Sequence, residues 1–503
     1  MTQPLQGNNH WILFSFFLRP ICYLCPVRRN KAPVILEELR IENYAAEGKS
    51  LAKLNGKVVF IENTVPGDIV DVQVFKNKKD WAEGFPLRFR KFSEERVDPF
   101  CEHFGVCGGC QWQMLPYEKQ LHYKEKQVGD MMARIGKIQA PTILPIIGAE
   151  ESRYYRNKLE YAFSCKQFIP ENEFRKLIAD GADVKAVAVK SVAGFYAKGV
   201  FDKVVEIEKC WLQSEPTNLL RNAIAEFSRE QNFHFYDFRE HNGWLRNMQV
   251  RMATTGEMMV NVILTDEDGK RMQPLFNFIQ GHFPQITTLL YTINAKRNDS
   301  IFDLNPQIVF GKGYIIEKLE NFQFKIGPKS FFQTNTRQAE KLYSITREFA
   351  ALTGHQTVYD LYCGTGSIGI FVSGSAKKIV GVELIAEAIA DAKENAALNN
   401  ISNAVFYKGD VIDTCTETFF EENGNPDVII VDPPRAGLHG KLVEKLLQVR
   451  APVIVYVSCN PATQARDISI LKDAYSVEKI QPVDMFPHTH HIENVMQLKL
   501  KTE

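Results

Sequence analysis

The sequence predicts a multidomain α/β protein in which a small β-barrel is followed by a central α+β region and an open, mostly parallel sheet. Short alternating strands near the amino terminus predict the barrel. A strand that runs into a glycine-rich turn at residues 358–369 predicts the start of the parallel sheet. Another apolar strand stops abruptly at Ser458-Cys459-Asn460-Pro461, which predicts a carboxyl edge of that sheet. At 503 residues, the chain has room for about three domains.

The composition excludes several classes of protein. The 60 basic and 60 acidic residues cancel, so a nucleic-acid surface would have to be a local patch. Ten unevenly spaced cysteines in a long chain favour a reducing cytoplasm and a metal or catalytic role over a disulfide scaffold. The hydrophobic run at residues 11–18 is too short to span a bilayer, so we expect no membrane segment. We also expect the protein to be cytoplasmic and monomeric. We expect residues 1–28 to be disordered or a spurious extension.

Residues 29–95 have the pattern of a small barrel. Turn signals at Glu47-Gly48 and Pro66-Gly67-Asp68 separate the predicted strands, which cover residues 34–41, 57–61, 69–76 and 81–92. The second half of this region interleaves cations with aromatic rings, which suits phosphate contacts and base stacking on an RNA strand. The residues are Lys76, Lys78, Lys79, Arg88, Arg90 and Lys91 with Phe75, Trp81, Phe85 and Phe89. The alternative is a solvated edge whose lysines prevent strand pairing.

Three cysteines, Cys101, Cys107 and Cys110, lie close together, and two glycines separate the last pair. Such a loop can wrap one inorganic centre, and thiolates suit zinc or an iron–sulfur cluster. A fourth ligand is needed, and Cys210, which ends a strand-like run, is a better candidate than Cys165. The residue types alone do not separate zinc from iron.

Residues 96–320 are predicted to form a central α+β domain. The pattern of residues 117–134 is charged and helical, residues 154–158 are predicted to open a strand, and residues 194–196 are predicted to start another. Arg156, Asn157 and Lys158 either contact RNA or are ordinary polar turn residues.

Several motifs at strand ends in the last third of the chain indicate its chemistry. Glu383 ends the strand after the glycine-rich turn, 23 positions beyond Asp360, where it could bind a ribose diol of NAD or of S-adenosylmethionine. An Asp432-Pro433-Pro434-Arg435 loop and the Cys459 strand end follow, and a dehydrogenase has no use for either. Cys459 is either a buried core thiol or a nucleophile at the carboxyl edge of the sheet.

From about residue 34 onward, the chain resembles the bacterial RNA uracil-C5 methyltransferases, in particular the 23S rRNA branch that carries a TRAM domain and a [4Fe–4S] cluster. The barrel resembles TRAM at Glu47-Gly48, residues 56–60 and residues 65–68. The other motifs are CxxxxxCGGC at 101–110 with a later cysteine, SFFQTN at 330–335, DLYCGTG at 360–366, VDPPRAG at 431–437, VSCNP at 457–461 and HIEN at 491–494.

The resemblance implies three domains and a set of site residues. It implies an OB-like TRAM barrel at 29–95, a central RNA-binding domain with the cluster at 96–320, and a Rossmann-like class I methyltransferase at 321–503. Cys459 would be the nucleophile and Glu493 the general base. The cluster would be held by Cys101, Cys107, Cys110 and Cys210. Contacts to S-adenosylmethionine are implied for Gln333, Tyr362, Glu383 and Asp432, with Ser367 and Asp410 as weaker candidates.

Two departures from the family pattern affect single contacts. Tyr196 stands where many relatives have Arg, which concerns one RNA contact, and Ser367 stands where several have Asn, which concerns one cofactor contact. Competing functions are methylation of tRNA, transfer to an exocyclic nitrogen, and a non-catalytic RNA-binding or assembly factor. Amino-methyltransferases usually follow the two prolines with an aromatic ring, whereas Arg435 follows here.

Overall fold

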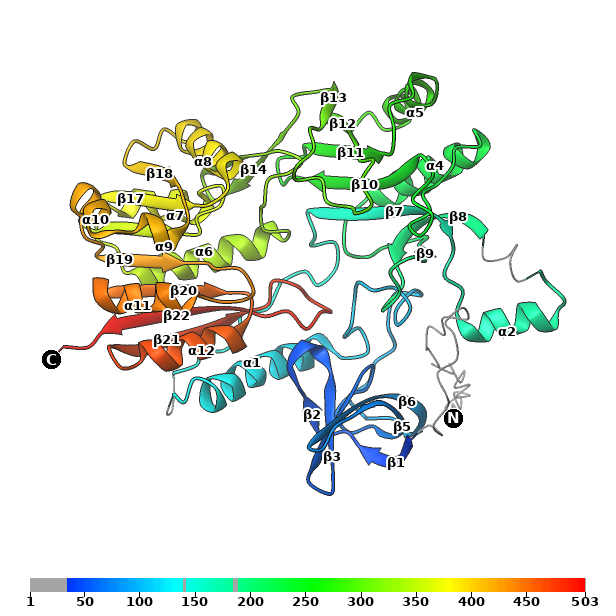
Figure 1. The fold of residues 1–503 in the computed structure, drawn as a ribbon, viewed down its shortest axis with the longest axis horizontal. Helices are drawn as coiled ribbons and strands as arrows, with labels where there is room; N and C mark the ends of the chain where they lie inside the picture. Colours follow the sequence, from blue (N-terminus) through cyan, green and yellow to red (C-terminus); the bar gives the residue numbers. More distant parts are fainter. Residues whose placement is uncertain (1–33, 139–141, 184–188, 503) are drawn as a thin grey trace, which may run out of the picture.

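A six-stranded, barrel-like sheet and two seven-stranded sheets form the framework of the computed structural model, which describes residues 34–138, 142–183 and 189–502. The barrel is blue in Figure 1, the central sheet is mostly green, and the C-terminal sheet runs from yellow to red. The predicted disorder or spurious extension of residues 1–28 lies outside the described residues. In the ranges that the structure describes, no helix is long and apolar enough to cross a membrane.

The amino-terminal sheet contains all four predicted strands and two more, in the order β1-β5-β6-β4-β3-β2. Alternate residues such as Val59, Ile61, Val70 and Val72 are fully buried in one core, as expected for strands with one face inward. The strand β3 was missed because Ala52 is its one fully buried apolar residue, which makes its alternation weak. The strands are β1 (Val34–Arg40), β2 (Asn43–Tyr44), β3 (Ser50–Leu54), β4 (Lys57–Ile61), β5 (Ile69–Asn77) and β6 (Trp81–Lys91).

The central sheet has the order β13-β12-β11-β10-β7-β8-β9 and is antiparallel except between β11 and β12. The prediction that residues 194–196 start a strand is wrong, because they end β8. Gly194 is no turn residue; a Cβ there would lie 2.1 Å from the Val205 carbonyl oxygen, so glycine lets β8 approach β9. The elements are β7 (Lys158–Lys166), α2 (Glu171–Ala179), β8 (Val189–Tyr196), β9 (Val204–Glu206), α4 (Thr217–Glu230), β10 (Leu245–Met252), β11 (Met258–Leu264), α5 (Gly269–His282), β12 (Thr288–Ile293) and β13 (Gln307–Phe310).

A hairpin of β14 (Ile315–Leu319) and β15 (Phe322–Ile326) leads into the C-terminal sheet, whose order is β18-β17-β16-β19-β20-β22-β21. All its strands are parallel except β22, which pairs antiparallel with β20 and β21. The elements are α6 (Thr336–Ala350), β16 (Thr357–Leu361), α7 (Ser367–Val372), β17 (Lys378–Glu383), α8 (Ala386–Leu398), β18 (Ala404–Lys408), α9 (Val411–Thr414), α10 (Glu417–Asn423), β19 (Val428–Val431), α11 (Gly440–Val449), β20 (Val453–Ser458), α12 (Pro461–Leu471), β21 (Tyr475–Val483) and β22 (Glu493–Leu500).

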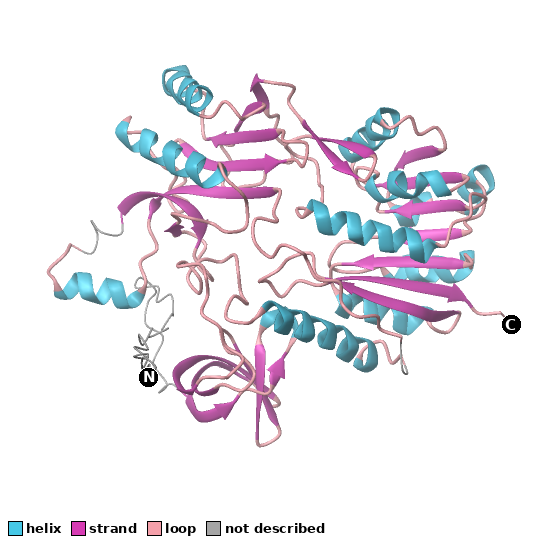
Figure 2. Cartoon of the chain, turned by 180° about the vertical axis from the view of Figure 1, so that it is seen from behind, coloured by secondary structure: helices cyan, strands magenta, loops and turns pink. Residues whose placement is uncertain are grey.

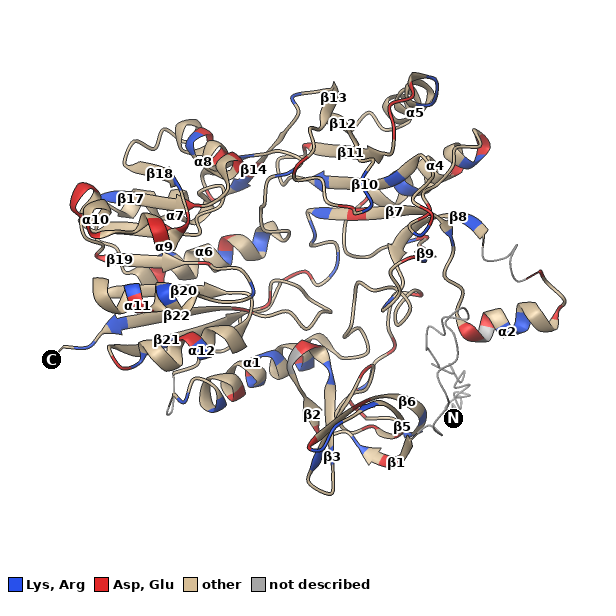
Figure 3. Ribbon diagram, viewed as in Figure 1, with Lys and Arg blue, Asp and Glu red and all other residues tan. Residues whose placement is uncertain are grey.

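Helices cover both faces of the C-terminal sheet, as Figure 2 shows. Along β20, Val455 and Val457 pack with α6, α7 and α8, whereas Ile454 and Tyr456 pack with α11 and α12. A strand that buries both faces has a continuous apolar sequence, which is what residues 453–457 show. Figure 3 shows Lys and Arg spread over the barrel, the central region and this sheet, in keeping with the balanced net charge.

The helix α1 (Tyr117–Arg134) has the predicted bounds but packs on the C-terminal sheet instead of the central one. Its Val128 and Met132 are fully buried in the same core as Ile468 of α12 and Ile480 of β21. The helix therefore lies between the barrel and the C-terminal sheet (Figure 1).

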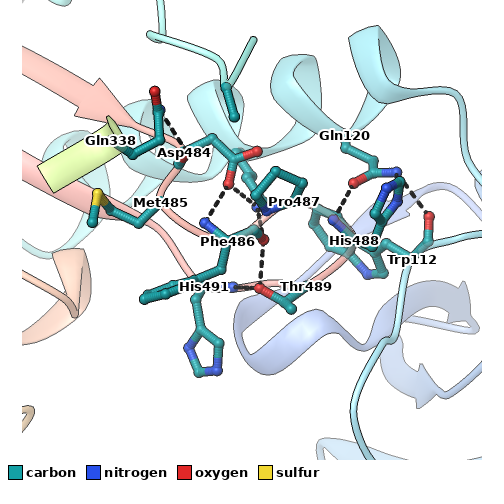
Figure 4. A network of polar contacts seen from close by, with 12 residues as sticks. Trp112, Gln120, Gln338, Asp484, Met485, Phe486, Pro487, His488, Thr489 and His491 are labelled. Atoms are coloured by element: carbon teal, nitrogen blue, oxygen red, sulfur yellow. Dashed lines mark hydrogen bonds and ion pairs between the residues drawn. The ribbon is translucent and has the colours of Figure 1, made fainter. Parts of the chain in front are cut away.

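The loop between β21 and β22, residues 484–492 and here called the β21–β22 loop, is tied to α1 by a buried ion pair. Lys124 Nζ lies 2.6 Å from Asp484 Oδ1, and both side chains are completely buried. Asp484 Oδ2 also accepts a hydrogen bond from the Tyr117 hydroxyl at 2.8 Å. The carbonyl oxygen of Asp484 accepts a bond from Gln338 Nε2, and the backbone N–H of His488 donates to Gln120 Oε1 (Figure 4).

Lys124→Met leaves the Asp484 carboxylate buried without its cation. Because an unpaired buried charge is strongly destabilising, we expect the free energy of unfolding to fall by about 3–5 kcal/mol. Urea unfolding followed by circular dichroism measures this change. Lys119→Met is the matched control on the same helix, since its ion pair with Glu95 is partly exposed to water and should contribute at most about 1 kcal/mol. Equal losses in the two variants would contradict the prediction.

Candidate active site

Five side chains that can carry chemistry meet at one edge of the C-terminal sheet because they share a face. One buried cluster contains, from five different strands, Val358, Ile379, Ile430, Val457 and Val495. Side chains alternate between faces, so even steps along these strands lead to the same side of the sheet. Counted in this way from the five buried residues, the side chains at the strand ends are those of Asp360, Glu383, Asp432, Cys459 and Glu493. The last comes from the antiparallel β22, whose start lies at the carboxyl edge of its parallel neighbours.

Cys459 and Glu493 are neighbours across the pairing of β20 with β22. Ser458 pairs with Asn494, which places the next residue of each strand side by side. Burial, and then the charges of Glu493 and Asp432, raise the pKa of the Cys459 thiol to about 12, while Arg435 opposes the shift. Glu493 is only 5% exposed, and burial followed by the Asp432 charge raises its pKa well above the usual range. Once it is ionised, such a buried carboxylate binds a proton more strongly than an ordinary glutamate does.

Two aspartates complete the negative part of the site. Burial raises the pKa of Asp360 to about 7, and burial with the nearby Asp360 raises that of Asp432 to about 7. Asp360 Oδ2 accepts a hydrogen bond from the Gly369 N–H at 2.8 Å, but its buried Oδ1 has no partner. Carboxylates that share a site in this way favour a cationic ligand.

The proline-rich loop after Asp432 is fastened to the segment after Cys459. The Arg435 carbonyl oxygen accepts hydrogen bonds from Asn460 Nδ2 at 3.0 Å and from the Thr463 hydroxyl at 3.2 Å. The Arg435 guanidinium donates to His491 Nδ1 at 3.2 Å, and burial lowers the pKa of this histidine to about 3, so the ring is neutral. The three motifs at 431–437, 457–461 and 491–494 are thus held as one unit.

The glycine-rich turn leaves space beside the acids. Gly364 has a φ of +54°, and a Cβ there would meet nothing within 4 Å. Its N–H donates to Glu383 Oε2 at 3.2 Å, and the Ile385 N–H donates to Glu383 Oε1 at 2.9 Å. Backbone without a side chain and an open flank allow close approach of a cofactor, so the turn fits a nucleoside ligand.

The other predicted cofactor contacts have different surroundings. The Gln333 carbonyl oxygen accepts a bond from Asn157 Nδ2 at 2.9 Å, which fastens its segment to the start of β7. Tyr362 packs partly into the core on the opposite face of the sheet. The Ser367 hydroxyl lies 3.0 Å from the Tyr343 hydroxyl, and Asp410 caps α9 through the Ile412 N–H. Ser367 and Asp410 therefore have structural partners, and their role toward a cofactor stays a prediction.

Four cysteines from two segments line one cavity of about 320 Å³, namely Cys101, Cys107 and Cys110 from one segment and Cys210 from the other. Cys165, the alternative fourth ligand, lies beside Asp237 instead. The Gly108 N–H donates to the Tyr196 carbonyl oxygen at 3.2 Å, and the Cys210 N–H donates to Asn218 Oδ1 at 2.7 Å. These bonds hold the two cysteine segments against the central sheet. The Tyr196 hydroxyl donates a hydrogen bond to Asp299 Oδ2 at 3.4 Å.

The cysteine cavity combines thiols with apolar neighbours. Phe104, Phe195 and Ile207 give it apolar walls, and burial raises the pKa of Cys107 and Cys110 to about 12. A bound cation would supply the charge that holds such thiols as thiolates. Across the described ranges, no three His, Cys, Asp or Glu side chains converge closely enough to hold one metal ion.

Comparison with known proteins connects this geometry to a family. A family model for tRNA (uracil-5-)-methyltransferases matches residues 303–501, and the TRAM domain model matches residues 33–87. A Bacteroides thetaiotaomicron protein described as an uncharacterized RNA methyltransferase is 50% identical over 460 residues, which are 91% of this chain and 100% of the relative. A protein of the same description from Porphyromonas gingivalis is 45% identical over 469 residues, 92% of this chain and 100% of the relative. The chain belongs to the RNA uracil-5-methyltransferase family.

A solved structure supports the same assignment across all three sheets. The Pyrococcus abyssi tRNA (uracil-54, C5)-methyltransferase, in complex with S-adenosyl-L-homocysteine, has a TM-score of 0.70 and 26% identity. The match covers 92% of this chain and 100% of that chain. The protein is therefore an S-adenosylmethionine-dependent RNA uracil-C5 methyltransferase with a TRAM domain, which confirms the family and the enzyme class predicted from the motifs. The non-catalytic alternative and the transfer to an exocyclic nitrogen do not fit this family.

The sequence interpretation missed residues that position the predicted ones. Asp360 was used to measure the spacing to Glu383, but it is itself a buried acid of the site. Asn157, left open between an RNA contact and a turn residue, supports the segment of Gln333. The strand-end position of Asp360 was a usable signal, whereas nothing in the sequence pairs Asn157 with residue 333.

Burial and the neighbouring charges raise the pKa of Cys459, which predicts slow reaction of its thiol in the free enzyme. Below a pKa of about 12 the thiolate fraction increases tenfold with each pH unit, so alkylation by iodoacetamide should accelerate about tenfold for each unit between pH 7 and pH 10. Peptide mass spectrometry measures the rate at Cys459. In urea-unfolded protein the rate should level off near pH 9, since an ordinary cysteine has a pKa of about 8.5. Asp432→Asn removes one of the opposing charges and should speed alkylation at a given pH. A native rate that is flat above pH 9 would contradict the prediction.

Proposed function

We propose that this enzyme methylates C5 of a uridine in 23S rRNA in the cytoplasm, as a monomer, through a covalent adduct between Cys459 and C6 of the base. The observation that carries the proposal is the thiol of Cys459 beside a buried carboxyl, Glu493, at the carboxyl edge of the sheet. The cysteine cavity and the barrel together favour the rRNA branch of the family. The second candidate substrate is tRNA, since the P. abyssi relative is named for uracil 54 of tRNA.

The proposed chemistry starts from the weak reactivity of the uracil C5. S-adenosylmethionine supplies an electrophilic methyl group on a sulfonium. The Cys459 thiolate adds to C6, and the electrons of the C5–C6 double bond move toward C5 and O4, which makes C5 a nucleophile. C5 would attack the methyl carbon, the S–CH3 bond would break, and S-adenosylhomocysteine would leave with the electron pair on its sulfur. Glu493 then accepts the C5 proton, the double bond forms again and the Cys459–C6 bond breaks. A base inside a stacked helix cannot reach the thiol, so the target uridine must be single-stranded or flipped out.

Residues around the glycine-rich turn would hold the cofactor. Glu383 would bind the ribose hydroxyls, and Asp432 would lie toward the sulfonium. The pKa of Asp432 is raised in the free protein, so a nearby positive charge would stabilise its carboxylate. Gln333, Tyr362, Ser367 and Asp410 are the remaining proposed contacts. The neutral His491 and the Arg435 guanidinium keep the proline-rich loop in place over the thiol.

We also propose that Cys101, Cys107, Cys110 and Cys210 hold a [4Fe–4S] cluster that shapes the central domain. The support is their common cavity, its apolar walls and its size. No group that could exchange electrons with a uridine is needed in the chemistry above, so the cluster would have a structural role. If reduction of an intact cluster changed the methylation rate severalfold, the structural role would be wrong.

The target and the nucleophile can be tested together in cells. A strain without the gene should lack 5-methyluridine at one position of 23S rRNA, and the wild-type gene should restore it while Cys459→Ala should not. Mapping of 5-methyluridine in rRNA and tRNA by mass spectrometry gives the answer. Loss of the modification from tRNA alone would exclude the rRNA assignment.

The proposed roles of Cys459 and Glu493 can be told apart by the covalent protein–RNA adduct that each variant forms. Wild-type protein should trap RNA that contains 5-fluorouracil, because fluorine at C5 cannot be removed as a proton. Glu493→Gln should accumulate the methylated adduct on normal RNA, visible as a protein band of raised mass, while Cys459→Ala should form no adduct. Rapid turnover by Glu493→Gln would exclude this residue as the base.

The proposed cluster has a spectroscopic signature that zinc lacks. Protein purified without oxygen should contain iron and sulfide and absorb broadly in the visible range, and Cys210→Ser should lose most of both. Cys165→Ser is the matched control, because Cys165 lies outside the cavity, and it should keep them. Zinc without iron in the anaerobic protein would contradict the proposal.

A further inference from the structure

Beside the cysteine cavity, two cations lie over aromatic rings in what we call the aromatic–cation patch: Phe100, Arg153, Tyr154, Lys209 and Trp211. The guanidinium of Arg153 is 4.0 Å from the ring centre of Phe100 and 5.1 Å from that of Trp211. Lys209 Nζ is 3.9 Å from the Trp211 ring, and the Tyr154 and Trp211 rings are 5.7 Å apart. No role in the methyl transfer uses any of these five residues.

The patch is open to solvent and its charge is not neutralised. Arg153 is exposed and Tyr154 is 37% exposed, while Phe100 and Trp211 are half-buried. Within the part of the chain that the structure describes, neither Arg153 nor Lys209 forms an ion pair with an acidic side chain. The nearby Glu151 pairs instead with Arg337 at 2.8 Å. Cations that stack on rings without an acid remain available to an anion.

The backbone holds one ring of the patch in an unusual conformation. Tyr154 has a φ of +56°, in the left-handed region that bulky residues rarely adopt. Its N–H donates to the Trp211 carbonyl oxygen at 2.7 Å, which fixes the two rings in relation to each other. Such a conformation persists only where the surroundings impose it, and it often marks a binding surface.

The patch borders the loop that leads to the catalytic base. The Phe100 ring lies 4.9 Å from the ring of His488, and the hydroxyl of Tyr155 donates to the Pro487 carbonyl oxygen at 3.0 Å. His488 precedes Glu493 by five residues, which span at most about 17 Å of extended chain. A strand bound on the patch would therefore lie within a few nucleotides of a base at Cys459.

We propose that the aromatic–cation patch binds the single-stranded RNA next to the target uridine, an inference that rests on the proposed action on an exposed uridine. One base stacks on the exposed ring of Tyr154, beside Trp211, and phosphates of the same strand contact Arg153 and Lys209. Rings with adjacent cations match single-stranded RNA, because every base offers a π-face and every linkage an anion. Phe100 and Trp211 each adjoin a proposed cluster ligand, so the cluster would also set the position of two rings.

Binding of a single-stranded oligouridine to the anaerobically purified protein tests the proposal. Replacing two phosphate contacts, as in Arg153→Ala/Lys209→Ala, should reduce the slope of log K against log salt by about 1.4. Tyr154→Ala should weaken binding about 5- to 100-fold, the effect of one lost stacked base, while Tyr154→Phe should retain most of the affinity. Lys312→Ala is the matched control: it removes a cation 5.8 Å from the ring of Tyr314, outside the patch, and should change neither quantity.

Cross-linking separates direct contact from an indirect effect on folding. Oligouridine that carries 4-thiouridine should cross-link to peptides containing Tyr154 or Trp211 in the wild-type protein, and visible absorbance shows that each variant keeps its metal centre. Unchanged affinity and salt slope in the patch variants, with no cross-link to these peptides, would overturn the proposal. Methylation is not needed for either readout. If the enzyme proved not to methylate uridine, the binding and cross-linking results would still decide whether the patch binds RNA. If the patch variants bound RNA and methylated it normally, the patch proposal alone would be excluded.

Discussion

The buried ion pair between Lys124 and Asp484 is the contact on which the arrangement of this enzyme depends. It joins a helix that follows the cysteine segment to the loop that precedes the proposed catalytic base. A lysine taken out of water is stable as a cation only beside an anion, and burial lowers the pKa of Lys124 against the opposing effect of Asp484. The helix and the β21–β22 loop therefore cannot separate without exposing both charges or leaving one unpaired.

The same loop connects the barrel to the chemistry. Gly48, in a turn of the barrel, is so close to His490 that a Cβ would lie 2.8 Å from the Cβ of the histidine. The next residue, His491, accepts a hydrogen bond from Arg435 in the proline-rich loop. A short run of residues thus touches the TRAM barrel at one end and the loop over the thiol at the other. RNA bound to the barrel and a uridine at Cys459 would share one rigid support.

The thiol itself has an environment that delays its reaction. Burial and two carboxyl groups raise the pKa of Cys459 in the free enzyme, and the nearby charge of Arg435 favours the thiolate. An entering cationic cofactor would offset the carboxylates, so the nucleophile would become reactive when both ligands are present. The acids beside Cys459 would therefore limit the reaction of its thiol with other molecules before the cofactor binds.

The sequence by itself predicted most of the strands, the glycine-rich turn and the residues proposed to react, because these are local patterns. Apolar runs ending at Asp432 and Cys459 are visible without a structure, and α1 has its predicted bounds. The sequence did not show that Gly194 lies inside a strand, that Asn157 supports Gln333, or that Lys124 faces Asp484 across 360 positions. Those contacts depend on which face each element buries against a distant partner. Only the tertiary structure decided them, since a pairing between remote residues leaves no periodicity in either segment.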